Sequence, residues 1–312
     1  MQNEKSVLIT ELFSLKIKNS GDEMSSHIND RSQIYRLELD LKNKNDARII
    51  AYNFIETRSS VLDVGCSCGD FGILITKNKN CAVYGMEKDP ESIRIARDSK
   101  TYKDLHEVDL NQFDEERFKN YYGFFDYIAF IDVLEHLINP DLVLLKMQKF
   151  LKTDGFFIIS LPNISFGEIK INILNDDFTY TDTGILDRTH LKFFTYKTII
   201  DLLTELNLEI SESAVKVADS NSRLYKVPFY IERYIRDNPH SYVYNYISKV
   251  SRSNLGKDEL RRLNTERIQV EWTSIEQELK LIRRLKWFEK FFPVGSRRRT
   301  YVKNIHMRVK GP

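Results

Sequence analysis

Residues 61–72 read VLDVGCSCGDFG, which is an apolar run, a glycine-punctuated turn and the start of a second apolar segment. Gly65, Gly69 and Gly72 allow a tight turn from a strand into a helix, where free backbone amides can face a ligand. Ser67 stands where a middle glycine is common, which makes the turn less permissive without forbidding it. The spacing favours a nucleotide-like ligand, and the alternative is a plain strand-to-helix turn.

Cys66 and Cys68 raise the question of a metal at this turn. No second Cys or His pair follows at zinc spacing, and Cys81 stands at the start of a strand. We therefore expect no metal here and interpret Cys66 as a small side chain beneath the ligand. Three cysteines in 312 residues do not suggest a disulfide framework, which points to a reducing compartment.

Strand-like and helix-like segments alternate on both sides of this turn, as in an open, mostly parallel α/β sheet. The expected strands are residues 61–64, 82–86, 105–108, 127–131, 156–160, 209–217 and 241–250. The last of them is expected to be an antiparallel edge strand. The expected helices are residues 47–55, 71–77, 90–98, 115–119, 141–151 and 196–206, with Gly155 ending the fifth.

The alternation breaks after residue 160, where a long segment rich in turn residues follows a strand. Such an insertion is typical of a lid or substrate-binding segment. We therefore expect an N-terminal extension at residues 1–45 and a main domain at residues 46–252, with an insertion at residues 163–195. A helical C-terminal extension is expected at residues 253–312.

Acidic residues follow three successive strands. Asp63 ends the first strand, where an exposed carboxylate can receive an ammonium group, and Glu87 follows the second at a distance suited to ribose hydroxyls. Asp109 follows the third strand, where it can meet the exocyclic amine of adenine. Glu87 alone would suit NAD equally well, whereas Asp63 and Asp109 suit it less.

The pieces LDVGCSCG, YGMEKDP, the aspartate of EVDL and IDVLEHLINP occur in this order at ordinary spacing. Together they resemble the class I S-adenosylmethionine-dependent methyltransferases, over roughly residues 47–250. The resemblance implies a Rossmann-like, mostly parallel seven-stranded sheet with helices on both faces, and S-adenosyl-L-methionine as cofactor. The cofactor-binding residues it implies are Asp63, Gly65, Cys66, Gly69, Glu87, Lys88, Asp109, Leu110 and Asp132.

LPN at residues 161–163 and TGILDRTHLKFFT at residues 183–195 give a narrower likeness. They resemble methyltransferases found beside or fused to glycosyltransferases in bacterial surface-polysaccharide assembly. This resemblance implies O-methylation of a sugar of a cell-surface glycan or its precursor, and a glycosyltransferase partner. It also implies substrate binding by Asn163, Asp187 and Arg188.

Methyl transfer to a hydroxyl needs an aligned acceptor and a base, and histidine is the usual base near neutral pH. His190 lies in the insertion and is the favoured base. His136 follows the fourth strand and is the second candidate, with a helix-cap role as its alternative. Asp132, Asp187 and Glu135 could supply oxygen ligands to a metal, but nothing in their spacing demands one, so no metal is expected.

The net charge of +2 hides an asymmetry, because residues 280–312 hold eleven Lys/Arg and one acidic residue, Glu289. The rest of the chain is mildly acidic, so we expect no nucleic-acid partner. The tail is expected to form an amphipathic helix that packs on a protein surface or touches an anionic membrane.

No long uncharged apolar run and no signal-peptide pattern occur, so we expect a cytoplasmic protein, peripheral at most to the inner face of a membrane. Two other functions stay open. The chain could methylate a small metabolite of the quinone or lipid-precursor type, or it could be a non-catalytic cofactor-binding module in a glycosyltransferase complex.

Overall fold

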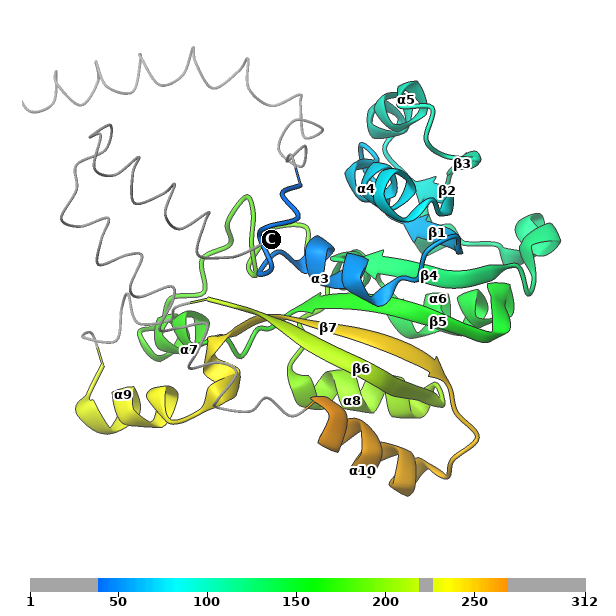
Figure 1. Cartoon of the computed structure of the whole chain (residues 1–312). Coiled ribbons are helices and arrows are strands. Elements are labelled where there is room, and N and C mark those ends of the chain that lie inside the picture. Colours follow the sequence, from blue (N-terminus) through cyan, green and yellow to red (C-terminus); the bar gives the residue numbers. More distant parts are fainter. Residues whose placement is uncertain (1–38, 219–226, 269–312) are drawn as a thin grey trace, which may run out of the picture. The chain divides into compact units, whose positions relative to one another are not determined.

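The computed structural model describes residues 39–218 and 227–268 (Figure 1). The chain divides after Glu38, and the described residues all belong to the part that starts at Leu39. Most of the N-terminal extension, and all of the basic tail at residues 280–312, therefore lie outside the described residues.

Seven strands form one sheet in the order β3-β2-β1-β4-β5-β7-β6. Strands β1 to β5 pair in parallel, and β7 is antiparallel to both of its neighbours. The strand order switches beside β1, where ligands of open α/β sheets bind at the carboxyl ends of the strands. The strands are β1 (Ser60–Val64), β2 (Ala82–Glu87), β3 (Asp104–Glu107), β4 (Phe125–Ile131), β5 (Leu151–Pro162), β6 (Leu208–Val217) and β7 (Val243–Arg252).

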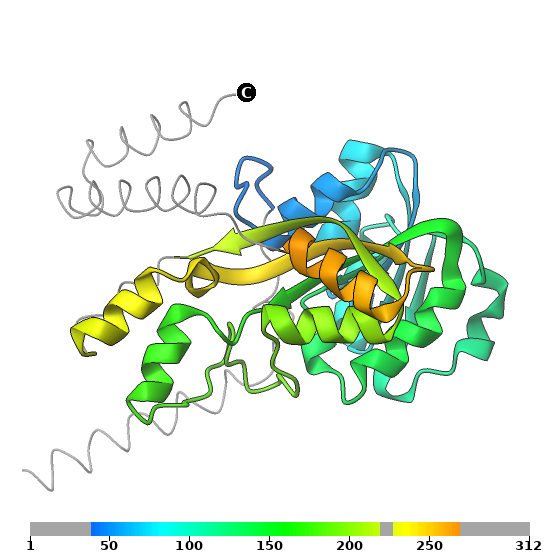
Figure 2. The ribbon, with the colours of Figure 1, turned by 90° about the horizontal axis from the view of Figure 1, so that it is seen from below.

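Helices cover both faces of the sheet, as the views in Figures 1 and 2 show. Apolar side chains of α3 and α4 pack on one face, and those of α6, α8 and α10 pack on the other. The α-helices are α3 (Ala47–Phe54), α4 (Asp70–Lys79), α5 (Pro90–Asp98), α6 (Pro140–Met147), α7 (Gly167–Leu174), α8 (Tyr196–Glu205), α9 (Phe229–Arg236) and α10 (Lys257–Ile268). Short 3₁₀ helices are η1 (Leu110–Gln112), η2 (Glu115–Tyr121), η3 (Leu134–His136), η4 (Gln148–Phe150) and η6 (Pro239–Tyr242).

Burial on both faces explains why the central strands are apolar almost throughout. Val61 of β1 packs with α3 and α4, whereas its neighbour Leu62 packs in the cluster on the opposite face. Both side chains are almost fully buried. A parallel strand covered on two sides reads as a continuous apolar run, and this confirms the predicted Rossmann-like sheet.

Two local expectations are wrong. Strand β7 is antiparallel as predicted, but it lies between β5 and β6, so β6 takes the edge. Gly155 does not end a helix, because it lies inside β5, where a Cβ would approach the Phe125 carbonyl oxygen to 2.9 Å. Its role is close strand packing instead.

The domain also extends beyond the boundary expected at residue 252. Leu260, Asn264 and Ile268 of α10 are buried. The Asn264 side chain bridges the start of β6, since its Nδ2 donates to the Leu208 carbonyl at 2.9 Å and its Oδ1 accepts from the Ile210 amide at 2.8 Å. Helix α10 therefore belongs to the body of the domain, and the boundary at residue 252 was placed too early.

Candidate functional site

The glycine turn after β1 is tied to the end of β2. The amide of Ser67, which has a φ of 47°, donates to Glu87 Oε2 at 2.9 Å. Glu87 Oε1 accepts from the amides of Lys88 and Asp89 at 2.7 and 2.9 Å. Glu87, the last residue of β2, thus holds two loops in place at the carboxyl edge of the sheet.

Gly65 is required at its position for two reasons. Its φ of 67° lies in the left-handed region, and an added Cβ would lie 2.7 Å from Val133 Cγ2. The backbone can therefore run close to the segment after β4 only without a side chain. This close backbone approach, together with the Glu87 carboxylate, fits an adenosine-containing cofactor, which needs ribose acceptors beside a bare turn.

Asp63 lies near the end of β1 as predicted, but its carboxylate is not exposed. Its carboxylate is buried, with 4% of the residue exposed, and it accepts a 2.7 Å hydrogen bond from the Tyr102 hydroxyl. Burial raises the pKa of Asp63 to about 7. The expected exposed carboxylate is wrong: Asp63 supports the turn from beneath, together with the buried Cys66 thiol, whose pKa burial also raises.

Two other expected cofactor residues follow β3 and β4. Asp109 is exposed, and its Oδ1 caps η1 by accepting from the Asn111 amide at 3.0 Å, which places the buried Leu110 beside it. Asp132 has a φ of 55°, and its Oδ1 accepts from Ser160 Oγ at 2.6 Å and Asn245 Nδ2 at 2.9 Å. A strained residue held by two buried partners is typical of a functional site.

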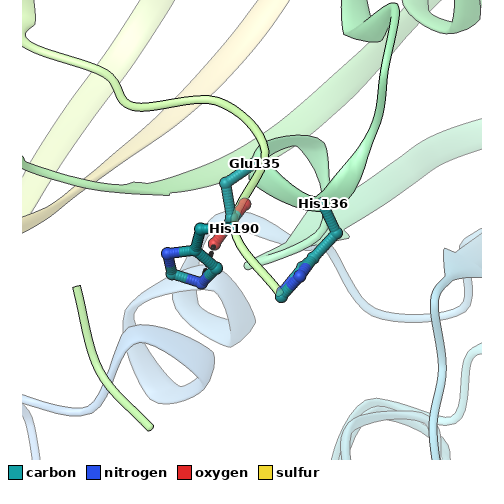
Figure 3. A group of neighbouring side chains, drawn as sticks. All are labelled: Glu135, His136 and His190. Atoms are coloured by element: carbon teal, nitrogen blue, oxygen red, sulfur yellow. Dashed lines mark ion pairs between the residues drawn. The ribbon is translucent and has the colours of Figure 1, made fainter. Parts of the chain in front are cut away.

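Three side chains from distant parts of the sequence meet beside this edge (Figure 3). Glu135 and His136 lie in η3, directly after β4, and His190 comes from the insertion. One ligand atom from each lies within 4.8 Å of the other two. The two imidazole rings contact edge to face at 4.7 Å between centroids, and His190 Nε2 lies 3.9 Å from Glu135 Oε1.

The insertion, which we call the lid segment (residues 163–195), fixes both imidazoles through Nδ1. His190 Nδ1 lies 2.9 Å from the Ile185 carbonyl, and His136 Nδ1 lies 3.2 Å from the Thr189 carbonyl. Carbonyl oxygens only accept hydrogen bonds, so each Nδ1 carries a proton, and in the neutral ring the lone pair is then on Nε2.

The carboxylate of Asp187 is linked to His136 through the side chain of Thr189. Thr189 Oγ1 donates to Asp187 Oδ1 at 2.7 Å, so it accepts from His136 Nδ1 at 3.0 Å. Through these two hydrogen bonds, Asp187 helps to position the His136 ring. No sequence pattern indicates a site role for four further residues, because each acts through a partner that only folding brings near. These residues are Thr189, Ser160, Asn245 and Tyr102.

Glu135 is the most unusual member of the cluster. It is fully buried, and neither carboxylate oxygen has a hydrogen-bond partner. Burial, reinforced by the charges of Asp132 and Asp187, raises the pKa of Glu135 well above its usual range. Burial and the neighbouring His190 lower the pKa of His136, so this ring is neutral at neutral pH.

The expected substrate residues divide into two groups. Asn163 is fully buried, and its Nδ2 donates to the carbonyls of His240 and Val243 at 3.0 and 2.9 Å, so its role is structural and the substrate-binding expectation is corrected. Arg188 is exposed on the lid segment, where its Nε lies 3.2 Å from Asp182 Oδ1. Lys88, which is one of the expected cofactor residues, is exposed directly after β2.

The chain matches known methyltransferases in sequence and structure. A family described as "Methyltransferase domain" matches residues 37–213. N-methyltransferase 4 of Papaver somniferum is 25% identical over 195 residues, which cover 58% of this chain and 53% of the relative. The chain therefore spans about half the length of the curated relative it matches.

Solved structures give the same kind of likeness. A SAM-dependent methyltransferase from Archaeoglobus fulgidus is 18% identical with a TM-score of 0.43, covering 67% of this chain and 96% of that one. The 1,6-didemethyltoxoflavin-N1-methyltransferase of Burkholderia thailandensis is 14% identical with a TM-score of 0.44, covering 80% and 90%. Because the family match covers more than half of the chain, this protein belongs to the methyltransferase domain family, and its described domain is a class I S-adenosylmethionine-dependent methyltransferase domain.

Proposed function

We propose that the protein transfers a methyl group from S-adenosylmethionine to a hydroxyl group on a sugar of a cell-surface glycan or its precursor. The observation that carries this proposal is the meeting of His136, His190 and Glu135 beside the carboxyl edge of β4. That edge also holds Asp132, which is one of the expected cofactor residues. A cluster with two imidazole lone pairs at this place suits a hydroxyl acceptor, whose proton must leave during transfer.

S-adenosylmethionine, when bound, supplies a sulfonium methyl group that is open to in-line displacement. The chain's own residues then have two tasks, which are to hold the acceptor hydroxyl in line and to manage its proton. The Nε2 atoms of His190 and His136 are directed by the Nδ1 contacts described above. His190, the favoured base, and His136 are therefore the groups proposed to receive the acceptor.

The surface of the lid segment supports a sugar as the acceptor. Phe178 and Tyr180 are exposed, and both rings contact Phe193, which in turn contacts the ring of His190. The exposed pair of Arg188 and Asp182 lies on the same segment. Sugars offer C–H faces to aromatic rings and hydroxyls to charged groups, so both features match this class of ligand.

Two partners are part of the proposal. A glycosyltransferase would deliver the sugar acceptor, and the basic residues 280–312 would attract an anionic membrane at which lipid-linked glycans are built. Within the described residues, no helix has the length and apolar character needed to span a bilayer. Flotation of the full chain with anionic vesicles, reversed by high salt, tests the membrane contact.

Methyl transfer from labelled S-adenosylmethionine to purified glycans, nucleotide sugars and small phenols tests the function. We expect label in the sugar fractions and none in the phenols, and alkaline-stable incorporation would identify an ether. Label in the phenols alone would favour the small-metabolite alternative. Binding of S-adenosylhomocysteine with no transfer to any acceptor would favour a non-catalytic cofactor-binding module.

A further inference from the structure

The carboxyl group of Glu135 lacks the partners that a buried carboxyl group normally has. The side chain is 1% exposed, and neither oxygen forms a hydrogen bond. An unpaired polar group in the protein interior costs about 1–3 kcal/mol, and more when it carries charge. Backbone amides of the lid segment reach only the Glu135 carbonyl oxygen, at 2.8 Å from Leu191 and 3.0 Å from Lys192. The side chain is thus directed toward the two imidazoles with nothing to bind.

The two imidazoles are prepared in the way that metal-binding histidines are prepared. A metal-binding histidine almost always donates its second ring N–H to a carbonyl or carboxylate, which fixes the ring and the tautomer. His190 does so to Ile185, and His136 does so to Thr189, whose hydroxyl is held in turn by Asp187. Both rings therefore present a lone pair on Nε2.

The separations suit one small cation. Ligand atoms about 2.1 Å from a shared ion lie about 3–4 Å from one another. His190 Nε2 and Glu135 Oε1 are 3.9 Å apart, and the three ligand atoms lie within 4.8 Å of one another. The nearby charges of Asp132 and Asp187 make the location favourable for a cation.

We propose that Glu135, His136 and His190 bind one divalent first-row transition-metal ion. Two imidazole nitrogens and one carboxylate suit Zn²⁺, Fe²⁺ or Co²⁺, whereas Mg²⁺ and Ca²⁺ prefer oxygen ligands throughout. Three protein ligands leave positions open on the ion, and an open position is the mark of a catalytic site.

The role of the ion rests on the proposed function. An acceptor hydroxyl that occupies an open position becomes more acidic, as water does on a bound metal. Its O–H bond breaks with the proton leaving to solvent, and the oxygen forms a bond to the methyl carbon. The S–CH₃ bond breaks at the same time, and its electron pair returns to sulfur, which leaves a neutral thioether. In this case the histidines hold the ion and do not take the proton themselves.

Binding of Co²⁺ to the full-length, chelator-treated protein tests the site without any methyl transfer. We expect one equivalent to bind with visible absorption bands, to be displaced by Zn²⁺, and to be unaffected by excess Mg²⁺. Glu135→Gln and His190→Ala should each weaken Co²⁺ binding at least about 100-fold, since the loss of a partner outside the ligand set already costs 10–100-fold.

His106→Ala is the matched control, because His106 lies at the end of β3 and pairs with Asp104 outside the cluster. Calorimetry with S-adenosylhomocysteine shows that each variant is folded, and Glu135→Gln is nearly isosteric. Co²⁺ binding that is absent, or equal in wild type and both cluster variants, would overturn the site. If Co²⁺ binds as expected but no sugar is methylated, the metal site stands and the proposed function fails. If chelator-treated protein that binds no Co²⁺ methylates sugars at full rate, the proposed function stands and the metal site fails.

Discussion

Glu87 and Glu135 both lie at the carboxyl edge of the sheet, after β2 and after β4, yet their surroundings are opposite. Glu87 is half-buried and receives three backbone N–H groups from two loops. Glu135 is fully buried and receives none on its side chain. The turn at residues 65–69 together with Glu87, which we call the cofactor edge, therefore has its hydrogen bonds formed in the folded chain. The acceptor cluster, which is Glu135, His136 and His190, instead contains a carboxyl group without a hydrogen-bond partner.

This difference separates two ways of building a site. At the cofactor edge, the Glu87 side chain holds the backbone of two loops through hydrogen bonds. At the acceptor cluster, backbone carbonyl groups hold the two imidazole rings, and the Glu135 carboxyl group has no hydrogen-bond partner. Substitutions in the two regions should consequently affect different measurements.

The largest effect is expected at the acceptor cluster. His190→Ala should lower kcat about 10²–10⁴-fold, because the cluster then loses a group that takes the acceptor proton or holds the ion that makes the acceptor more acidic. Affinity for S-adenosylhomocysteine should change less than about threefold, since no cofactor-edge residue contacts this ring. Single-turnover methyl transfer and calorimetry measure the two quantities. If kcat and the affinity for S-adenosylhomocysteine fell by the same factor, the prediction that the two regions affect different measurements would be wrong.

Asp63 tests whether a buried carboxyl group beneath the turn makes the free energy of unfolding depend on pH. Its folded-state pKa of about 7 lies above the unfolded value of 3.8, so the native state holds an extra proton between these values. The free energy of unfolding should fall as pH rises from about 4 to about 7, by about 3–4 kcal/mol from this group. In Asp63→Asn the slope should become shallower by this amount, as measured by urea unfolding of ligand-free protein, and the part that comes from Glu135, whose pKa is also raised, should remain.

The control for Asp63→Asn is Asp126→Asn, because Lys152 and Ser60 hold the pKa of Asp126 below its usual range. Its contribution is complete above the unfolded pKa and is lost only on acidification. Asp126→Asn should therefore keep the wild-type slope between pH 5 and about 7. A wild-type slope in Asp63→Asn would show that the buried carboxyl does not titrate in this window.

Glu87→Ala should weaken cofactor binding by about 1.5–3 kcal/mol with a small effect on the acceptor step. The substitution removes the carboxylate that we propose accepts from the ribose hydroxyls, and it also frees the Ser67 amide. Calorimetry with S-adenosylhomocysteine measures the loss. Glu107→Ala is the control, since Glu107 is paired with Glu87 in the β2–β3 register and is exposed. The same loss in both variants would point to general charge and not to the turn.

The smallest expected effect compares two glycines with the same backbone angle. Gly65 and Gly123 have φ values of 67° and 65°, but a Cβ on Gly65 would meet Val133, whereas one on Gly123 meets nothing within 4 Å. Gly65→Ala should cost about 1–2 kcal/mol more in free energy of unfolding than Gly123→Ala. Partial recovery by Val133→Ala would assign the excess to the steric clash. Equal costs would mean that the turn moves freely.

Most of the fold could be predicted from the sequence because the pattern was local. The apolar run before Gly65, and the acidic residues after successive strands, follow from burial on two faces and from ligand binding at strand ends. The interior place of β7 could not be predicted, since an antiparallel strand can join a sheet at the edge or by insertion with the same alternation.

The site was predicted in part for the same reason. His136, His190 and Glu135 were each singled out, but their meeting depends on how the lid segment returns to η3, which no local pattern encodes. Asn163 looked like a substrate residue because it is polar and follows a strand. Only the structure shows that the base of the lid segment uses its amide to satisfy two buried carbonyls.

The amides of Leu191 and Lys192 both bond to the backbone oxygen of Glu135. The peptide that supplies one member of the cluster is therefore the anchor for the segment that supplies another. Any displacement of residues 185–192 would remove His190, free the ring of His136 and release this anchor in a single event. The arrangement of the cluster and the seated segment are in this sense one state, and neither can change without the other.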